Sequence, residues 1–392
     1  MKSVISKLLV DAIKALGDFS TRDLFGRLCE KENLIQIASL TPKLRNTPLE
    51  YVGYWQGSAP GHLAPQAAPA PKLVLSFQDG QIHATYQGQP AEVLVYDPAN
   101  YHSRHRSMTI SQKLAGKRVA VIGLGSIGGK IAKELAKHGV ELFLVDVDEI
   151  EIENPYRLSL GQPLEFLIGL SKCAATEEDI LLTVPNAKIH TAVMDIAAQS
   201  KAFDTLISSI RPDAIVLSVD TRDGTRQANA TARHYGIPLF QAVLSGGAET
   251  GQIRFVSKAP SSACLLCLDS WDTTADLSDS RRQYAEELSP AQKAVPALSV
   301  DTSIISYITS KLVMAQLAGE DIQRYFTVTG SDGRCQGDIM WISTTPETWI
   351  TEDFLQKVVA SVEKRPNCPG CWSPDLAALR QKKQQRKESV QP

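Results

Sequence analysis

The hydrophobic pattern at the start of the chain has helical spacing. Apolar residues recur every three or four positions from Ile5 to Leu16, and Gly17 follows them as a helix stop. A second short helix is expected around residues 24–28. The chain is therefore predicted to open with an amphipathic helix.

Shorter apolar runs follow, and they favour strands. They lie at residues 73–77, 81–86 and 93–96, with a hairpin turn between the first two. Residues 57–71 are so rich in Ala, Pro and Gly that they predict a linker. We expect residues 1–98 to form a small N-terminal α+β appendage.

From Arg118 apolar runs alternate with amphipathic segments, which is typical of βαβ units in a mostly parallel sheet. Strands are expected at residues 119–122, 142–145 and 214–219, and helices at residues 127–137, 172–182 and 303–317. A polar stretch predicts a crossover loop at about 268–302. The sequence thus predicts an α/β fold with a Rossmann-like domain over residues 99–372, helices on both faces of its sheet, and a polar basic tail over residues 373–392.

Composition and charge narrow the classes of partner. The chain has 41 Lys and Arg against 43 Asp and Glu, so its formal net charge is −2 and no chain-wide field favours nucleic acid or membrane. No apolar run approaches the roughly 18 residues of a membrane span, and the N-terminus lacks the pattern of a secretory signal. We expect a cytoplasmic protein that binds neither nucleic acid nor membrane.

A glycine-rich segment is the first candidate site. Gly123-Leu-Gly125-Ser-Ile-Gly128 follows an apolar strand and opens a helix, which is the context that a nucleotide-binding turn requires. The glycines let the backbone approach phosphate, and the free N–H groups of the helix start attract its charge. Asp146 ends the next strand and is placed to accept hydrogen bonds from ribose hydroxyls. This spacing fits either NAD or ATP, and a tight turn without a ligand is the alternative.

The residues that follow distinguish an ATP site from an NAD site. The pattern comprises an Asp-x-Asp, an Asn-x-x-Arg, a downstream Lys, an Asp that ends a later strand, and two glycine segments: Asp146 and Asp148, Asn154 and Arg157, Lys172, Asp220, Gly236-Ile-Pro238 and Gly251-Gln-Ile253. In this order, over residues 100–372, it resembles the ubiquitin-activating enzymes and the ThiF/MoeB-type adenylating enzymes of thiamine and molybdopterin synthesis. The resemblance implies ATP-dependent adenylation of the C-terminal carboxylate of a ubiquitin-like or sulfur-carrier protein.

The resemblance also implies roles for individual residues. Adenylation brings a carboxylate to the α-phosphorus of ATP, so cations must neutralise two groups of like charge. By resemblance, Arg157 and Lys172 hold the triphosphate, and Asn154 hydrogen-bonds it. The resemblance also implies that Asp220 holds the Mg²⁺ that bridges phosphate oxygens.

Each assignment has an alternative. Arg104 or Arg106 lies where family members carry an arginine that reaches the ATP site of a partner subunit, which implies a homodimer; a plain basic linker is the other interpretation. Arg157 and Lys172 have the alternative of solvated surface cations. Asp220 has that of a cap for the following helix.

Four of the seven cysteines form two Cys-x-x-Cys pairs. Cys264 with Cys267 and Cys368 with Cys371 have the spacing of zinc knuckles, and four thiolates complete a tetrahedral structural Zn²⁺ site with no open position for catalysis. A redox pair or unrelated buried thiols are the alternatives. The remaining Cys29 and Cys335 are interpreted, with no such partners, as small core hydrophobes.

The chain departs from its relatives at the nucleophile. Many relatives carry a catalytic Cys in the crossover loop, and here none occurs between Cys267 and Cys335. Three routes stay open: a partner attacks the acyl-adenylate, Cys173 takes the acyl group, or a hydroxyl accepts it as an oxyester, with Ser289 closest to the family position and Ser299 next. A hydroxyl needs a base, and the sequence assigns none.

Two other classes of function also stay open. The Gly123 turn with Asp146 fits an NAD-dependent Rossmann oxidoreductase, which has no use for Mg²⁺ or four zinc-binding thiols. A catalytically inactive binding module of the same fold is the second, although such a module has no physical need for Arg157, Lys172 and Asp220 together. The expected task of the appendage is to dock the carrier protein or a ubiquitin-conjugating-like partner.

Overall fold

The structure is a computed structural model of the chain. It describes residues 1–15, 22–29, 31, 33–41, 43–44, 47–56, 73–78, 81–97, 100, 108–152, 154–158, 160–244, 248–269, 297–330, 333–346, 348, 353–366, 368 and 370–371. The chain splits into two compact units, Met1–Arg104 and His105–Pro392. Each unit is described by itself.

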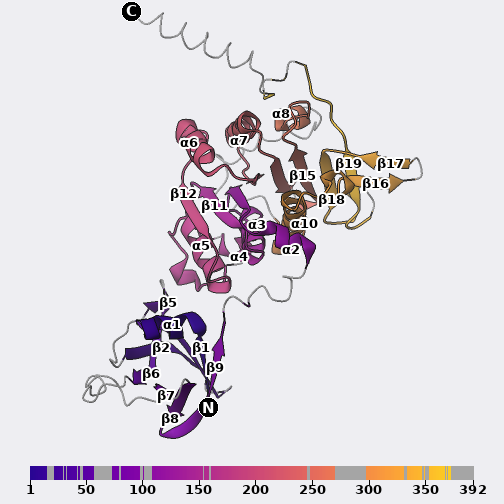
Figure 1. The fold of residues 1–392 in the computed structure, drawn as a ribbon. Coiled ribbons are helices and arrows are strands. Elements are labelled where there is room, and N and C mark those ends of the chain that lie inside the picture. Colours follow the sequence, from indigo (N-terminus) through magenta and orange to yellow (C-terminus); the bar gives the residue numbers. More distant parts are fainter. Residues whose placement is uncertain are drawn as a thin grey trace, which may run out of the picture. The chain divides into compact units, whose positions relative to one another are not determined.

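Seven strands of the first unit close into a barrel (Figure 1). Their order is β1 (Lys2–Ser6), β3 (Leu34–Ser39), β2 (Arg22–Cys29), β6 (Glu50–Gln56), β7 (Leu73–Gln78), β8 (Gln81–Tyr86) and β9 (Gln89–Tyr96). β1 closes the ring by pairing in parallel with both β3 and β9. The other elements described in this unit are a hairpin of β4 (Lys43–Leu44) and β5 (Thr47–Pro48) and the helix α1 (Lys7–Ala15).

Apolar side chains fill the barrel. Ile5, Leu24 and Leu73 are fully buried, and Val10 and Ile13 of α1 pack against the same core. Burying such a side chain stabilises a fold by roughly 1.5–3 kcal/mol. The stretch predicted as one helix is therefore divided between two elements. Ile5 lies in β1 of the barrel, and the helix begins only at Lys7.

The prediction of a helix around residues 24–28 is wrong, because these residues belong to β2. β2 pairs with β3 and β6 on its two sides. A Cβ at Gly26 would lie 1.8 Å from the carbonyl oxygen of Gln36, so the neighbouring strand approaches too closely for any other residue. Tertiary pairing overrides local spacing here. The three strands predicted farther on are present as β7, β8 and β9.

The second unit is built on an eight-stranded sheet (Figure 1). Its order is β12 (Ile189–Val193), β11 (Glu141–Asp146), β10 (Arg118–Ile122), β13 (Ala214–Leu217), β14 (Leu239–Leu244), β15 (Thr250–Val256), β18 (Ile339–Ser343) and β19 (Lys357–Ala360). The first five strands are parallel, and the last three pair antiparallel. The predicted mostly parallel α/β sheet is confirmed.

Helices cover both faces of this sheet. One face carries α2 (Thr109–Leu114), α3 (Gly128–Lys137), α5 (Lys172–Thr183) and α10 (Ser299–Leu317), and the other carries α6 (Ser200–Ile210), α7 (Arg222–Tyr235) and α8 (Leu265–Asp269). Alternate residues of β10 serve the two cores: Val119 and Val121 face the first, and Ala120 and Ile122 face the second. A strand buried on both faces is apolar throughout, which explains the continuous runs in the sequence.

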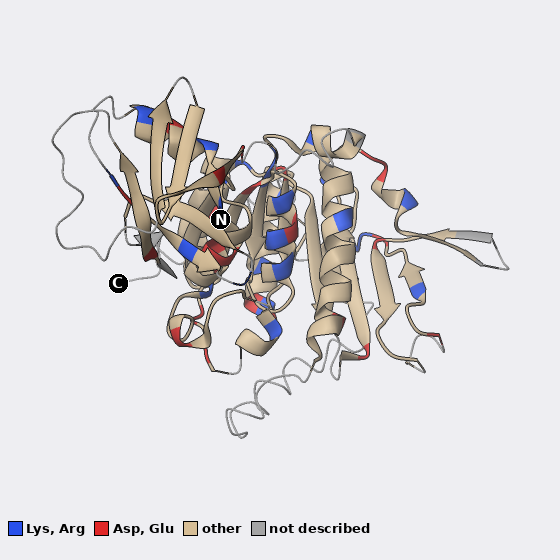
Figure 2. Ribbon diagram, turned by 90° about the horizontal axis from the view of Figure 1, so that it is seen from below, with Lys and Arg blue, Asp and Glu red and all other residues tan. Residues whose placement is uncertain are grey.

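Shorter elements complete the unit: α4 (Pro155–Leu158), the 3₁₀ helices η3 (Leu164–Phe166) and η7 (Ile322–Arg324), and a hairpin of β16 (Thr327–Gly330) and β17 (Gly333–Gln336). Charged residues lie mainly on helices and loops, while the strands of the sheet are mostly uncharged (Figure 2). In the part of the chain that the structure describes, no helix has both the length and the apolar character to cross a membrane.

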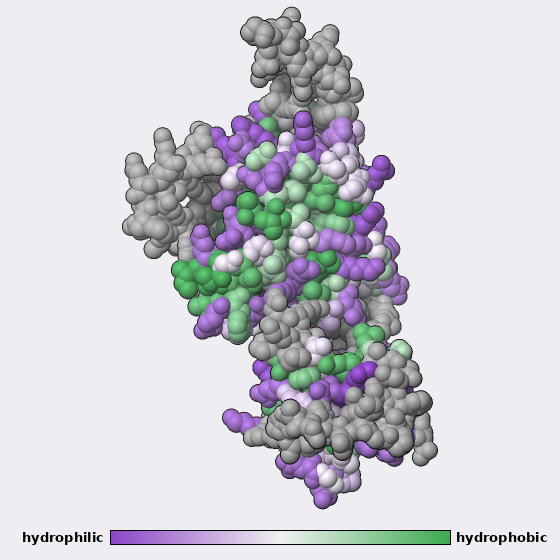
Figure 3. Space-filling model, turned by 90° about the vertical axis from the view of Figure 1, so that its left-hand side faces the viewer, coloured by the Kyte–Doolittle hydropathy of each residue, from purple (hydrophilic) through white to green (hydrophobic). Residues whose placement is uncertain are grey.

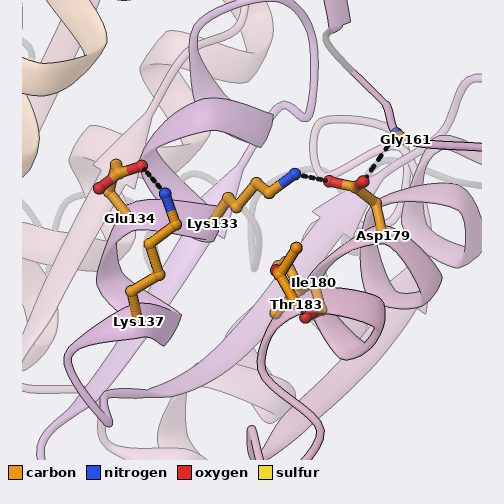
Figure 4. A network of polar contacts seen from close by, with 7 residues as sticks. All are labelled: Lys133, Glu134, Lys137, Gly161, Asp179, Ile180 and Thr183. Carbon is orange, nitrogen blue, oxygen red and sulfur yellow. Dashed lines mark hydrogen bonds and ion pairs between the residues drawn. The ribbon is translucent and has the colours of Figure 1, made fainter. Parts of the chain in front are cut away.

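One ion pair joins α3 to α5, and a second lies within α3 (Figure 4). Lys133 Nζ lies 2.7 Å from Asp179 Oδ2 on α5, and the other oxygen of Asp179 accepts the N–H of Gly161 at 2.8 Å. Within α3, Lys137 pairs with Glu134. The side chain of Asp179 is only 4% exposed, so these partners offset the cost of removing its charge from water.

Candidate functional site

The glycine turn joins the end of β10 to the start of α3. Gly123 has φ +86°, and a Cβ there would lie 2.5 Å from the carbonyl oxygen of Ser218. A Cβ at Gly128 would lie 1.8 Å from the carbonyl oxygen of Gly123. These two glycines are therefore required for the turn itself. A Cβ at Gly125 meets no heavy atom within 4 Å, so this glycine leaves open space above the backbone.

Three strands end at the same edge as this turn. β10 pairs in parallel with β11 on one side and β13 on the other, and Ile122 is in register with Val145 and Leu217. β11 and β12 follow β10 on one side of it in the sheet. The chain then crosses over, so that β13 and β14 lie on the other side of β10. Ligands of open α/β sheets bind at such a switch point, at the carboxyl ends of the strands.

Asp146, at the end of β11, holds the turn in place. Its Oδ2 accepts the N–H of Leu124 at 2.5 Å, and its Oδ1 accepts the N–H of Asp148 at 2.8 Å. Burial raises the pKa of Asp146, although the two backbone hydrogen bonds and the charge of Lys172 oppose that effect. Each carboxylate oxygen has a second lone pair, so the predicted ribose contact remains chemically available.

Lys172 and Asp148 meet at this edge. Lys172 begins α5, and its Nζ donates to Asp148 Oδ2 at 2.6 Å while its backbone N–H donates to the carbonyl of Asp148 at 2.9 Å. The side chain of Lys172 is 15% exposed, whereas that of Asp148 is 58% exposed. The structure thus holds the cation beside the turn, which differs from the alternative of a solvated surface lysine.

Asn154 and Arg157 lie at the short helix α4. The carbonyl of Asn154 accepts the N–H of Arg157 at 3.0 Å, and Asn154 Oδ1 accepts the N–H of Glu151 at 3.3 Å. Asn154 therefore begins the helix that carries the half-buried Arg157. This helix also contacts the segment that leads into α10, because Tyr156 Oη donates to the carbonyl of Ala297 at 3.2 Å.

Asp220 is exposed and follows β13 at the same edge of the sheet. The residue at the N-cap of α7 is Thr221, so the alternative in which Asp220 caps this helix is wrong. An exposed carboxylate at this edge is free of that structural task. Arg104, Arg106 and Ser289 lie outside the described residues.

Cys173 is a poor nucleophile in this fold. Its thiol is buried and lies 3.6–3.7 Å from the carbonyl oxygens of Leu144, Asp146 and Ala192. Burial, reinforced by the charge of Asp146, raises its pKa to about 11. The thiolate is the reactive form, so the route through Cys173 is disfavoured.

The four cysteines of the two Cys-x-x-Cys pairs lie together on the sheet face that carries α6, α7 and α8. All four are buried, and their sulfur atoms lie within 4.8 Å of one another. Cys264 Sγ lies 3.9 Å from Cys267 Sγ and 3.6 Å from Cys368 Sγ, and Cys267 Sγ lies 3.5 Å from Cys371 Sγ. A disulfide needs about 2.0 Å, whereas tetrahedral sulfurs at Zn–S distances of about 2.3 Å are about 3.8 Å apart. The donor set fits a structural Zn²⁺.

The thiols of this cluster have divergent pKa values. Burial raises the pKa of Cys264, and burial raises the pKa of Cys371 to about 11. Burial acts the same way on Cys267, but hydrogen bonds, first from the backbone N–H of Arg365, lower its pKa to about 6. A metal would bind the thiolates, so its binding would release the protons of these thiols.

Asn229 joins the two knuckles, and the sequence carries no signal of it. This fully buried side chain of α7 accepts the N–H of Leu265 at 2.9 Å and donates to the carbonyl of Gly370 at 3.0 Å. Arg365 adds a second link, because its guanidinium donates to the carbonyl of Leu266 at 2.6 Å. By contrast, Cys335 is exposed, so its interpretation as a core residue is wrong.

Comparison with known proteins places these features together. Residues 102–339 match the ThiF family. Ubiquitin-like modifier-activating enzyme 5 of Drosophila willistoni is 28% identical over 166 residues, covering 40% of this chain and 40% of the relative. The enzyme of the same name from Caenorhabditis elegans is 27% identical over 166 residues, covering 40% and 38%. The chain thus matches about two fifths of the length of these relatives.

Solved structures show a similar fold. The microcin C7 biosynthetic enzyme MccB in complex with N-formylated MccA has a TM-score of 0.52 at 15% identity, covering 70% of this chain and 75% of that chain. Escherichia coli MccB with AMPCPP and selenomethionine MccA has a TM-score of 0.51 at 16% identity, with coverage of 70% and 75%. At such identities the likeness is one of fold.

Proposed function

Because this chain belongs to the ThiF family, we propose that it uses Mg-ATP to adenylate the C-terminal carboxylate of a ubiquitin-like or sulfur-carrier protein, or of a peptide. The observation that carries the proposal is the open space at Gly125 at the switch point of the sheet, on a turn held by Asp146, with the Lys172 cation paired to Asp148 two residues beyond. The names of the relatives support it, because they activate ubiquitin-like modifiers. The fold of MccB supports the peptide alternative.

The proposed roles follow from charge. Lys172 and Arg157 would neutralise the triphosphate, and Asn154 would hydrogen-bond it. Asp146 and Asp148 would face the ribose side of the nucleotide. Mg²⁺, held by Asp220, would neutralise phosphate charge when the metal is bound.

A homodimer would complete the site, because Arg104 or Arg106 of one subunit would then reach the ATP of the other. Figure 3 shows apolar side chains gathered between polar ones on one side of the α/β unit. Among the exposed apolar residues are Ile152, Tyr156 and Phe166, on the segment between β11 and α5. Exposed apolar groups of this size favour a protein interface.

We further propose that the four cysteines hold one structural Zn²⁺, which suits a reducing cytoplasm where thiols stay free. The N-terminal barrel would dock the carrier or a ubiquitin-conjugating-like partner. Protein lacking residues 1–98 should keep ATP use and lose carrier transfer. Unchanged adenylation and transfer of the carrier would contradict the docking role.

The test of adenylation is pyrophosphate exchange into ATP with a matched pair of variants. The carboxylates offered are ubiquitin-fold proteins ending in Gly-Gly and a synthetic peptide with a free C-terminus. Gly125→Ala adds a methyl group where the fold has room, so it should leave the melting temperature unchanged and raise the KM for ATP by about tenfold or more. Gly129→Ala makes only ordinary contacts, the nearest at 3.4 Å, and should behave as wild type.

Two results would reject the adenylation proposal. One is no exchange with any of these carboxylates, together with tight binding or turnover of a nicotinamide cofactor, which favours the oxidoreductase. The other is no nucleotide binding at all, which favours a binding module.

A further inference from the structure

A buried lysine lies against the first turn of α10. Lys130 belongs to α3 and is 6% exposed, yet its Nζ lies 2.8 Å from the carbonyl oxygen of Ser299, 3.0 Å from Ser299 Oγ and 2.6 Å from Thr302 Oγ1. Ser299 itself is half-buried. Among the described residues, Lys130 pairs with no carboxylate, so all its partners are neutral oxygens.

The surroundings of Lys130 oppose its positive charge. It occupies the first turn of α3 and contacts the first turn of α10, and the N-terminal end of a helix carries partial positive charge. Burial lowers the pKa of Lys130 to about 8. About a tenth of the side chain is therefore the neutral amine at pH 7, and about half at pH 8.

The contacts of Lys130 can also be made by a neutral amine. Such an amine has two N–H donors and one lone pair. Nζ donates to all three oxygens in the structure; in the deprotonated amine the two remaining donors would serve the Ser299 carbonyl and Thr302 Oγ1, and the lone pair would accept the O–H of Ser299. The amine then sits where a general base for the Ser299 hydroxyl must sit, within about 3 Å.

The pair lies about two helical turns along α10 from the glycine turn. Ser306 Oγ, two turns along α10, donates to the carbonyl of Ile127 at 3.2 Å. Seven residues of helix span about 10 Å, so Ser299 lies roughly that far along the axis from the turn. The contact from Tyr156 to Ala297 links the segment before Ser299 to α4, which carries Arg157.

We propose that Ser299, with Lys130 as its base, is the acyl acceptor that replaces the missing crossover cysteine. The inference rests on the proposed adenylation. Ser299 Oγ attacks the carbonyl carbon of the carrier acyl-adenylate, and a C–O ester bond forms. The anhydride bond to AMP breaks, AMP leaves with the electron pair, and the hydroxyl proton moves to Lys130 Nζ. The product is a carrier oxyester.

The pH profile of this step depends on the groups around Lys130. One cavity of about 170 Å³ is lined by Lys130 together with other titratable side chains: Lys133, Glu134 and Lys137 of α3, Asp179 of α5 and Tyr307 of α10. Asp301 of α10 accepts the N–H of Leu298. Lys133 and Lys137 are paired with Asp179 and Glu134, so Lys130 differs in having neutral partners.

The first experiment tests the pair without a carrier. The full chain is treated with a fluorophosphonate, and the adduct is mapped by mass spectrometry. We expect labelling at Ser299, faster as pH rises through about 8, and slowed about 100-fold by Lys130→Met. Lys130→Arg keeps a cation and donors but cannot act as a base, so it should be equally slow.

Two results of this experiment would overturn the proposal. One is an unlabelled Ser299 in protein whose melting curve is that of the folded chain. The other is wild-type labelling in Lys130→Arg, because Lys130 would then serve only to hold α10. Ser303→Ala, one turn away, is the matched control and should label as wild type.

The second experiment uses the Gly-Gly carriers with ATP and Mg²⁺. Wild-type protein should form a carrier adduct that resists dithiothreitol and is cleaved by hydroxylamine. Ser299→Cys should convert it to a dithiothreitol-sensitive thioester. Exchange without an adduct rejects the Ser299 route and leaves adenylation standing, whereas absent exchange rejects adenylation and leaves the pair to be judged by fluorophosphonate labelling.

Discussion

The four-cysteine cluster and the glycine-turn edge belong to the same α/β unit, but they differ in what their residues leave open. In the cluster, the four buried sulfurs already lie within 4.8 Å of one another, and Asn229 hydrogen-bonds to both knuckles. At the edge, Gly125 leaves space and Asp148 and Asp220 are exposed. A closed donor set stabilises a fold, whereas an open one leaves room for a ligand. Stability and activity should therefore separate between the two regions.

The largest expected effect breaks the cluster. Cys368→Ser removes one of four ligands, so the protein should lose its zinc and about 4 kcal/mol or more of unfolding free energy. Metal analysis of the purified protein and chemical denaturation measure the two losses. Cys335→Ser changes an exposed thiol and should alter neither. A zinc-free Cys368→Ser with wild-type stability would show that the cluster is not structural.

The next effect is on activity at the edge. Lys172→Ala removes the cation beside the turn, so pyrophosphate exchange should slow by about 100-fold or more. Its partner Asp148 is 58% exposed, so the loss of unfolding free energy should stay below about 1 kcal/mol. Exchange rates and denaturation curves of the same preparation give both values.

Lys133→Ala is the counterpart of that variant. Lys133 also forms an ion pair, at 2.7 Å, but its partner Asp179 is buried. Removing the cation leaves the buried Asp179 carboxylate without its ion-pair partner, which should cost about 3 kcal/mol of unfolding free energy. The KM for ATP should not change. A variant that lost ATP affinity and kept its stability would reverse the comparison.

A smaller effect tests how Asn229 supports the four-cysteine cluster. Asn229→Ala leaves the N–H of Leu265 and the carbonyl of Gly370 without their partner, which should cost about 2 kcal/mol. Zinc should still bind, with about 10-fold weaker affinity, because the residues that orient the ligands have changed but the ligands have not. Competition with a chelator measures the affinity. Equal affinity in the variant would assign Asn229 to helix packing alone.

The last expected effect is a pH dependence of stability at Lys130. Burial lowers its pKa from 10.5 to about 8, so between these values the unfolded chain binds more protons, and the stability contributed by this residue rises with pH. Below about pH 8, Lys130 is protonated in both the folded and the unfolded chain, so the full free-energy cost of burying its charge is present. The stability difference between Lys130→Met and wild type should therefore shift in favour of wild type as pH rises from about 8 to 10.5. Lys113→Met, at an exposed lysine, is the control for denaturation curves across this range.

Local patterns predicted much of the α/β unit. The runs of β10, β11 and β13 are apolar on both faces because helices cover both, and Gly123 and Gly128 are needed wherever a strand turns sharply into a helix. The same patterns failed for β2, where pairing with two neighbouring strands decides the conformation. They also failed for Cys335, whose exposure depends on where its hairpin lies.

The sequence by itself determined the parallel sheet, the glycine turn and the two cysteine pairs, because spacing and local sterics encode each of them within a few residues. Only the tertiary structure decided that Asn229 joins both knuckles and that Lys130 meets Ser299 across 169 positions. The physical reason is that contacts between distant segments depend on strand order and helix packing. Those contacts form when the whole chain buries its apolar surface, so they cannot be predicted from any short segment.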